Sequence, residues 1–476
     1  MPPRGNAPLL IDGAHGEGGG QILRTAVSLS TITGRPIRIE RIRANRRNPG
    51  LAAQHLTAVR AAAALCAAQL RGDALASQEL DFVPRAPGSA GDYAFYVALA
   101  REGGSAGAVS LVLQTVLLPL ALASGKSRVA VRGGTHLPQS PPVDYLCRVW
   151  LPILRRIGID AEIALDAWGW FPVGKGEIHA TIVGAPEARR YPRALWLVER
   201  GALRRVAGRA VAANLPAHIP ERMSHRARAL LEPLGTALDI RPECVRAACP
   251  GAGIFLTAEY ESVSAGFSCL GARGTPAEAV AEEAATSLLA HHASGAALDR
   301  HLADQLILPL SFARDVSAYS VETVSRHLET SAWVVAQFGL ADARIGRTSS
   351  GTGRVTITPK PAVRPFDLRA NESAGAARAE GKEIADPVVA RYREAGADCM
   401  RTFVRLADAY DFLCHGADEG AFEMSDIESM EGMVIVSRHA FEELRRLDEA
   451  ERDGWLAVLS LTLAGGGDSS PRPQDS

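Results

Sequence analysis

Apolar positions along the chain recur in one three-part pattern. An apolar stretch with helical spacing comes first, a turn that contains glycine follows, and a short segment rich in β-formers comes last. The pattern occurs at residues 21–33, 34–36 and 37–42, and again at residues 111–123, 124–126 and 129–131. A third helix is predicted at residues 277–292, followed by a turn at Gly295 and the segment 302–312. Three such units predict an α/β protein whose helices pack on sheets.

The pattern changes at two places along the chain. Between about residues 187 and 274, an Arg-rich strand at 203–211, a helix at 220–234 and an alternating strand at 254–260 predict a small inserted α/β domain. From about residue 360, helices are predicted at 386–411 and 437–461, and the end GGGDSSPRPQDS is predicted to be disordered. The expected parts are two core units (1–186), the insert (187–274), a third core unit (275–359) and a mainly helical extension (360–476).

Composition narrows the class of protein. The 476 residues exceed the roughly 250–300 at which a single core stops growing, so several domains are expected. The longest apolar run, 108–123, is interrupted by Gln114 and Pro119 and is shorter than the ~20 residues of a membrane span, which predicts a buried helix. The N-terminus lacks an apolar secretory segment, so the cytoplasm is the expected location. Seven scattered cysteines without a CxxC pair encode neither a zinc cage nor a disulfide framework.

Charge is distributed unevenly along the chain. From residue 361 onwards 13 Lys and Arg stand against 23 Asp and Glu, whereas residues 1–360 hold 39 basic and 30 acidic side chains. The basic body is compatible with a nucleic-acid partner, although the net charge of −1 for the whole chain conceals this. The acidic extension could pack on the basic face as an autoinhibitory mimic of a nucleic acid, recruit a protein partner or add a helical domain.

The strongest local candidate for chemistry is the glycine-dense turn HGEGGGQILR at residues 15–24. Glycines allow backbone N–H groups to crowd around an anion, Glu17 could hold a divalent cation, and Arg24 could meet negative charge. Such turns also occur without any ligand. Two related motifs fail: Gly125-Lys126-Ser127 lacks the first glycine of a P-loop, and His15-x-Glu17 lacks the Pro-Cys-x-x-Cys partner of zinc deaminases.

Further polar residues remain ambiguous on pattern alone. Six arginines at positions 35–47, Arg43 among them, precede a helix that carries His55, and they could bind phosphates or coat an edge strand. Gln114 lies within an apolar helix, so its amide either binds backbone or faces a ligand. A lone histidine such as His327 is more often a surface or packing residue than a catalytic one.

Six motifs in order, taken together, resemble the RNA 3'-terminal phosphate cyclases. The resemblance covers about residues 9–359. The motifs are IDGAHGEGGGQILRTAVSLS (11–30), IRANRRNPGLAAQHLTAV (42–59), LVLQTVLLPL (111–120), GGTHLPQSPPVDY (133–145), HLADQLILPL (301–310) and the His327 segment SRHLET (325–330).

The resemblance implies repeated α/β units of the cyclase and enolpyruvyl-transferase architecture, with a small α/β domain inserted before the last unit. It also implies an ATP-dependent, ligase-type enzyme that uses Mg²⁺ or Mn²⁺. A histidine, matched here by His327, takes AMP from ATP, and AMP passes to an RNA 3'-terminal phosphate to give RNA-3'-pp-5'-A. The vicinal 2'-hydroxyl then closes a 2',3'-cyclic phosphate and releases AMP.

The same resemblance assigns roles to further positions. It places the metal on Glu17 and the phosphates on Arg24 and Arg43, with His55 nearby. Residues expected to frame the adenylate are Gln114, His301, Leu302, Ala303, Asp304 and Gln305, where His301 could stack on adenine.

The chain departs from the family pattern in four places. Thr330-Ser331 stands where the family commonly has Thr-Asn, Gly174-Lys175-Gly176 replaces a run of glycines, Gly274-Thr275-Pro276-Ala277-Glu278 lacks a lysine, and the extension is additional. None of these removes a reacting group. Two alternatives remain: a non-catalytic RNA-binding ribosome-assembly factor on the same fold, and an enolpyruvyl transferase, which would need anion-binding arginines without an essential histidine. The presence of His327 favours the cyclase.

Overall fold

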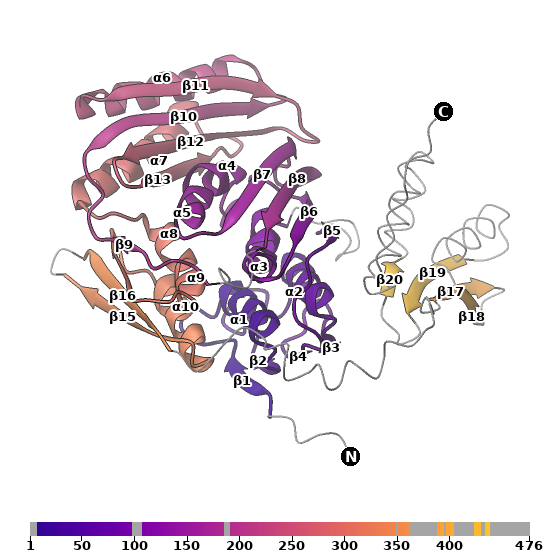
Figure 1. Ribbon diagram of the computed structural model, residues 1–476. Helices are drawn as coiled ribbons and strands as arrows, with labels where there is room; N and C mark the ends of the chain where they lie inside the picture. The colour runs from indigo at the N-terminus through magenta and orange to yellow at the C-terminus, as the bar shows by residue number, and fades with distance from the viewer. Residues whose placement is uncertain are drawn as a thin grey trace, which may run out of the picture. The chain divides into compact units, whose positions relative to one another are not determined.

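The computed structural model forms two compact units, Met1–Asp367 and Leu368–Ser476 (Figure 1). Each unit is described by itself. The structure describes residues 7–97, 107–184, 191–348, 351–360, 388–394, 397–403, 423–429 and 434–437.

The first unit contains three repeats of one strand and helix pattern. In the first repeat β1 pairs in parallel with β2, and β4 lies antiparallel between β2 and β3. Helix α1 ends where Gly34 adopts a left-handed φ of 69° and donates its N–H to the Ser30 carbonyl, a conformation that glycine takes at little cost. The elements are β1 (Leu9–Asp12), α1 (Gly20–Thr33), β2 (Ile37–Glu40), α2 (Ala53–Cys66), β3 (Gln69–Arg71) and β4 (Leu80–Val83).

The second repeat has the same sheet order, with β5 and β6 parallel and β8 antiparallel between β6 and β7. Its first helix, α3, is the apolar run that the sequence predicts to be buried. A single π-helical turn, Leu146–Trp150, joins α4 to α5. The elements are β5 (Asp92–Tyr96), α3 (Val109–Leu122), β6 (Lys126–Gly133), α4 (Val143–Tyr145), α5 (Leu151–Arg156), β7 (Asp160–Ala167) and β8 (Gly176–Val183).

The third repeat is split by the insert. Strand β9 (Trp196–Leu197) pairs in parallel with β14 (Ser317–Val321), and the sheet order β9-β14-β16-β15 repeats that of the other two. Between β9 and β14 the chain first builds the insert and then the helices of the repeat. Those helices and the remaining strands are α8 (Arg300–Gln305), α9 (Ile307–Leu310), α10 (Arg326–Gln337), β15 (Ala341–Arg347) and β16 (Gly353–Pro359).

Two predictions about the third unit are therefore wrong: its first helix belongs to the insert, and the insert does not end at residue 274. The expected helix exists as α7 (Ala277–Ser294), but its apolar face, with Val280 and Leu288, packs into the separate core of the insert. The segment 302–312, placed as the β-rich part, is mostly helical because it forms α8 and α9. The other elements of the insert are β10 (Leu203–Ala213), α6 (His218–Leu231), a 3₁₀ turn (Glu232–Leu234), β11 (Ala237–Val245), β12 (Gly251–Tyr260) and β13 (Ser264–Leu270).

In the second unit the described residues form an antiparallel sheet of order β18-β17-β19-β20. The helix predicted at 386–411 is wrong, since β17 and β18 occupy most of it and contain the β-formers Val388, Val389 and Tyr392. Apart from Ser437, the helix predicted at 437–461 and the terminal segment lie outside the described residues. The strands are β17 (Val388–Glu394), β18 (Ala397–Phe403), β19 (Glu423–Ser429) and β20 (Val434–Ser437).

The three repeats share one hydrophobic core, to which each contributes helices and strands. Helices α1, α3, α9 and α10 gather at the centre of this unit, with the repeat sheets around them (Figure 1). Because α10 packs against both α1 and α8, residues far apart in sequence meet at the ends of these helices. In the part of the chain that the structure describes, every helix is too short or too polar to span a bilayer.

Candidate active site

His327 lies in the first turn of α10 and faces the glycine turn of the first repeat. The helix begins at this point because Ser325 caps it, with its hydroxyl oxygen accepting the Leu328 N–H at 3.2 Å. The Nδ1 atom of His327 lies 2.9 Å from Oε2 of Glu17, and it also contacts Oε1 of Gln21. The predicted nucleophile and the predicted carboxylate are thus neighbours.

The glycine turn can approach α10 so closely because side chains are missing from it. A Cβ atom on Gly16, whose φ is 57°, would lie 2.7 Å from Oγ1 of Thr330. At Gly20 a Cβ would lie 2.0 Å from Nε2 of His55. The missing side chain at Gly16 therefore lets the turn lie close to α10, and the missing side chain at Gly20 lets it lie close to His55 on α2.

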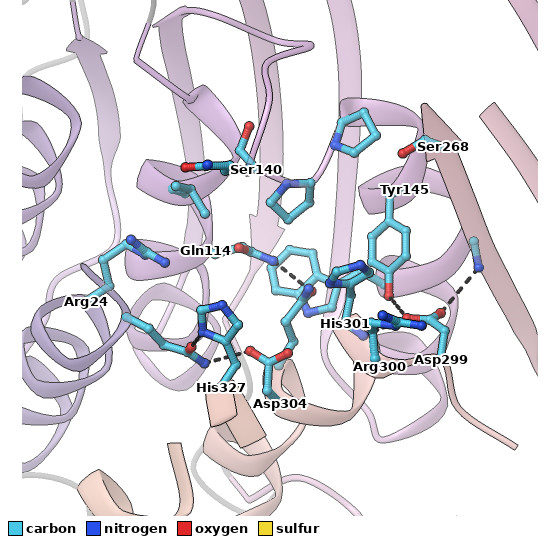
Figure 2. A pocket seen from close by; sticks show the side chains of 18 of the residues that line it. Arg24, Gln114, Ser140, Tyr145, Ser268, Asp299, Arg300, His301, Asp304 and His327 are labelled. Carbon is cyan, nitrogen blue, oxygen red and sulfur yellow. Dashed lines mark hydrogen bonds between the residues drawn. The ribbon is translucent and has the colours of Figure 1, made fainter. Parts of the chain in front are cut away.

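A cavity of about 760 Å³ opens beside His327 (Figure 2). Its walls come from α1, α3, α8, the loop at residues 137–142 and strand β13 of the insert, so all three repeats and the insert contribute. This volume is in the range of cavities that bury ligands of nucleotide size. The predicted residues that line it are Arg24, Gln114, His301, Asp304, Gln305 and His327.

Hydrogen bonds between repeats fix the polar wall of the cavity. Nε2 of Gln21 donates to Oδ2 of Asp304 at 2.6 Å and to Oγ of Ser331 at 2.6 Å. Nε2 of Gln114 donates to Oε1 of Gln305 at 2.8 Å (Figure 2). Each bond joins a helix of the first or second repeat to one of the third repeat, so the wall exists only when the repeats are packed together.

A second network supports His301. Asp299 caps α8 by accepting the N–H groups of His301 and Leu302, each at 2.9 Å, and it also accepts the Tyr145 hydroxyl at 2.8 Å. The rings of Tyr145 and His301 meet edge to face with centroids 6.4 Å apart (Figure 2). His301 is therefore held at the cavity wall from two elements.

Burial lowers the pKa values of the basic groups at the cavity and raises that of the acidic group. Burial lowers the pKa of Arg24 to about 10, so its guanidinium is still charged at neutral pH, aided by Asp304 and Glu17. Burial raises the pKa of Asp304 to about 7 against the opposing effects of Gln21 and Arg24. Burial also lowers the pKa of His327, and Arg24 lowers it further against the effect of Glu17, so its imidazole is neutral at pH 7.

Of the five predicted residues that do not line the cavity, Glu17 contacts His327 and the other four lie away from the site. Arg43 donates to the Gly50 carbonyl at 2.8 Å on the loop after β2. His55 is buried at the start of α2, and burial, with Arg24 and Arg43 adding to it, holds its pKa well below the ordinary value. Leu302 and Ala303 are fully buried in the core, so only their backbone could serve a ligand.

Sequence reasoning assigned no role to Gln21, Tyr145, Asp299 or Ser331. The signal for Gln21 was present, since it directly follows the glycine turn and opens α1. A second signal lies in the repeated sequence. Gln114 and Asp304 each stand five residues before the proline of a Leu-Pro-Leu tripeptide. This correspondence marks them as equivalent positions of two repeats.

A divalent cation would fit this site only as an ion shared with a substrate. Among the residues that the structure describes, no three His, Cys, Asp or Glu side chains are grouped as a metal cage. Glu17 alone offers a carboxylate beside His327, and its oxygens currently contact Arg46 and His327. Mg²⁺ commonly takes one or two carboxylates and completes its shell with water and substrate phosphates, which suits a single glutamate.

Comparison with known proteins assigns the chain to a family. The family model described as RNA 3'-terminal phosphate cyclase matches residues 15–345. This chain belongs to that family. The RNA 3'-terminal phosphate cyclase of Methylococcus capsulatus is 58% identical over 354 residues, covering 74% of this chain and 97% of that protein. The cyclase so named from Nostoc punctiforme is 54% identical, covering 70% and 95%, and that from Salmonella agona is 45% identical, covering 69% and 92%.

A solved enolpyruvyl transferase from Streptomyces tendae covers 75% of this chain and 82% of its own, at 12% identity and a TM-score of 0.17. That similarity is too low to carry an argument. The matched residues begin after β1, end within β15 and include the whole insert, so the site described above lies wholly within the match.

The carboxyl of Asp304, half-buried at the cavity wall, predicts that the stability of the protein depends on pH. Its pKa is raised to about 7 from the ordinary value of 3.8, so the folded protein keeps a proton that the unfolded chain releases as pH rises. As pH rises from about 4 to about 7, the free energy of unfolding of wild type should therefore fall by up to about 4 kcal/mol relative to that of Asp304→Asn. Urea unfolding of both proteins across this range measures the difference. The control is Asp342→Asn, because Asp342 is exposed. The prediction would be contradicted if the difference in unfolding free energy between wild type and Asp304→Asn did not change with pH.

Proposed function

We propose that the chain is an ATP-dependent RNA 3'-terminal phosphate cyclase that works through a histidyl-AMP intermediate. The observation that supports this most directly is the position of His327. Its neutral imidazole lies at the cavity, beside Glu17 and close enough to Arg24 for that cation to lower its pKa. A neutral imidazole is nucleophilic near pH 7, and a phosphoramidate is a reactive carrier of AMP.

The first step forms a bond from Nε2 of His327 to the α-phosphorus of ATP and breaks the bond to pyrophosphate. Arg24, which stays charged at the cavity wall, is suited to the charge that develops on the phosphoryl oxygens. Glu17 would hold Mg²⁺ or Mn²⁺, and the metal would supply further positive charge at the phosphates. Gln114, His301, Asp304 and Gln305 line the wall that would receive the nucleoside.

The second and third steps transfer and release AMP. An oxygen of the RNA 3'-phosphate attacks the adenylyl phosphorus, and the bond to His327 breaks. The 2'-hydroxyl then attacks the activated 3'-phosphorus, loses its proton and expels AMP, which leaves the 2',3'-cyclic phosphate. The last attack is intramolecular and benefits from a high effective molarity.

The test separates an enzyme from a binding factor. Incubation of the full chain with ATP labelled at the α-phosphate and Mg²⁺ or Mn²⁺, without RNA, should leave acid-labile AMP on the protein. Addition of an RNA with a 3'-phosphate should discharge the label and give a phosphatase-resistant cyclic end. A protein that binds RNA ends yet forms no covalent adduct would instead support the non-catalytic assembly factor on the same fold.

A further inference from the structure

Nδ1 of His327 faces two hydrogen-bond acceptors. One is the carboxylate oxygen Oε2 of Glu17 at 2.9 Å, and the other is the amide oxygen Oε1 of Gln21. Neither oxygen can donate when Glu17 is ionised, so Nδ1 must carry the ring proton. In a neutral imidazole the other nitrogen, Nε2, then holds the free lone pair. The environment of Nδ1 therefore decides which nitrogen can act as a nucleophile.

The other end of the Gln21 amide is fixed independently. Its Nε2 donates at 2.6 Å both to Oδ2 of Asp304 and to Oγ of Ser331. A flipped amide would place its oxygen against the Asp304 carboxylate and its NH₂ against the N–H of His327, and it would lose both of those bonds, whereas the Ser331 hydroxyl could donate to the oxygen instead. The bonds that end on His327 and on Asp304 are drawn in Figure 2. The network thus holds Oε1 on the histidine.

The carboxylate of Glu17 is shared with partners other than Nδ1 of His327, whereas the amide oxygen of Gln21 is not described with another partner. The other oxygen of Glu17 pairs with Arg46, and Glu17 is also the carboxylate that would receive the metal. The oxygen of Gln21 has no cation to neutralise. Gln21 therefore stays available to Nδ1 when the charges around Glu17 change.

We infer that Gln21 is a positioning residue that keeps the proton of His327 on Nδ1 and presents Nε2 to the cavity, with Ser331 and Asp304 fixing the amide. The inference rests on the proposed adenylyl transfer, for which His327 is the nucleophile. Gln21 acts through His327 rather than on the substrate. Ser331 stands at the position where the sequence departs from the family pattern, and its hydroxyl serves as the acceptor there.

A kinetic comparison of two glutamines tests this role. Gln21→Met keeps the length of the side chain and removes its hydrogen bonds. In the full chain it should lower the saturating rate constant of AMP adduct formation by about 10- to 100-fold, with half-saturation by ATP within about twofold of wild type. Gln114→Met, which loses a bond to Gln305 and does not contact His327, should mainly raise the ATP concentration for half-saturation. A saturating rate for Gln21→Met within about twofold of wild type would overturn the inference.

The anchor at Ser331 gives a second kinetic comparison. Ser331→Ala removes one of the two acceptors for the Gln21 amide and should lower the saturating rate by about 3- to 10-fold. Ser331→Thr keeps the hydroxyl and should recover most of that loss. An alanine variant as fast as wild type would show that Ser331 does not hold the amide. Thermal melting of each variant separates these effects from loss of the fold.

A spectroscopic measurement without ATP separates this inference from the proposed function. In full-length protein labelled with ¹⁵N-histidine, the His327 signals are those absent from His327→Ala. Wild type should show a protonated Nδ1 and a bare Nε2, and Gln21→Met should show more of the opposite tautomer. A wild-type ring with its proton on Nε2 would refute the inference regardless of activity. The expected tautomers in a protein that forms no AMP adduct would refute the proposed function alone.

Discussion

Replacement of His327 by alanine should abolish covalent labelling by α-labelled ATP, a loss of at least about 10³-fold. The imidazole at the cavity is the proposed nucleophile, and alanine leaves no atom that could accept the adenylyl group. Cyclisation of RNA 3'-phosphates should be lost in parallel, because each later step needs the adduct. Gel autoradiography of the denatured protein and chromatography of the RNA ends measure the two effects.

The matched control is His225→Ala, since His225 is an exposed histidine on α6 of the insert. It should label as wild type does. Undiminished labelling of His327→Ala would move the nucleophile to another residue and would contradict the proposed mechanism.

Replacement of Arg24 by methionine should slow adduct formation by about 10²- to 10³-fold. The half-buried guanidinium lines the cavity, and its pKa of about 10 keeps it charged at neutral pH. Methionine fills similar space without charge, so the phosphoryl oxygens would lose a cation at close range. Arg24→Lys keeps the charge but loses the two-pronged donors of the guanidinium. Its rate of adduct formation should lie between those of wild type and Arg24→Met. Single-turnover labelling at saturating ATP measures all three rates.

Arg60→Met provides the control for a lost arginine, because Arg60 pairs with Asp73 on the surface of α2. Its labelling rate should match that of wild type. A normal rate for Arg24→Met would place the phosphates elsewhere than beside α1.

The repeats were predictable where periodicity and local chemistry agree. Helices α1 and α3 each end near a glycine turn and lead into a β-rich strand, and both were placed within a residue or two. The third repeat was misassigned because α7 is also a helix with buried apolar positions, and a helical pattern does not say which core a helix joins. The pairing of β9 with β14 spans the whole insert, so no local pattern could reveal it.

The sequence predicted which residues form the candidate site better than it predicted the contacts between them. Ordered motifs led to His327, Glu17 and Arg24, and the structure brings His327 and Glu17 into contact. The bond between Gln21 and Asp304 depends on the packing of two repeats, which spacing along the chain does not encode. Arg43 and His55 were grouped with these residues by sequence, yet the cavity excludes their side chains.

The split third repeat has a consequence for synthesis on the ribosome. Gln21 leaves the exit tunnel early, but Asp304 follows 283 positions later and Ser331 follows 310 positions later. At about 5–20 residues per second the first helix waits roughly 15–60 s for these partners. A chain that ends within the insert lacks α10, and with it His327 and Ser331, so these contacts of Gln21 cannot form. The proposed transfer of AMP is therefore expected only from chains whose translation has passed both the insert and α10.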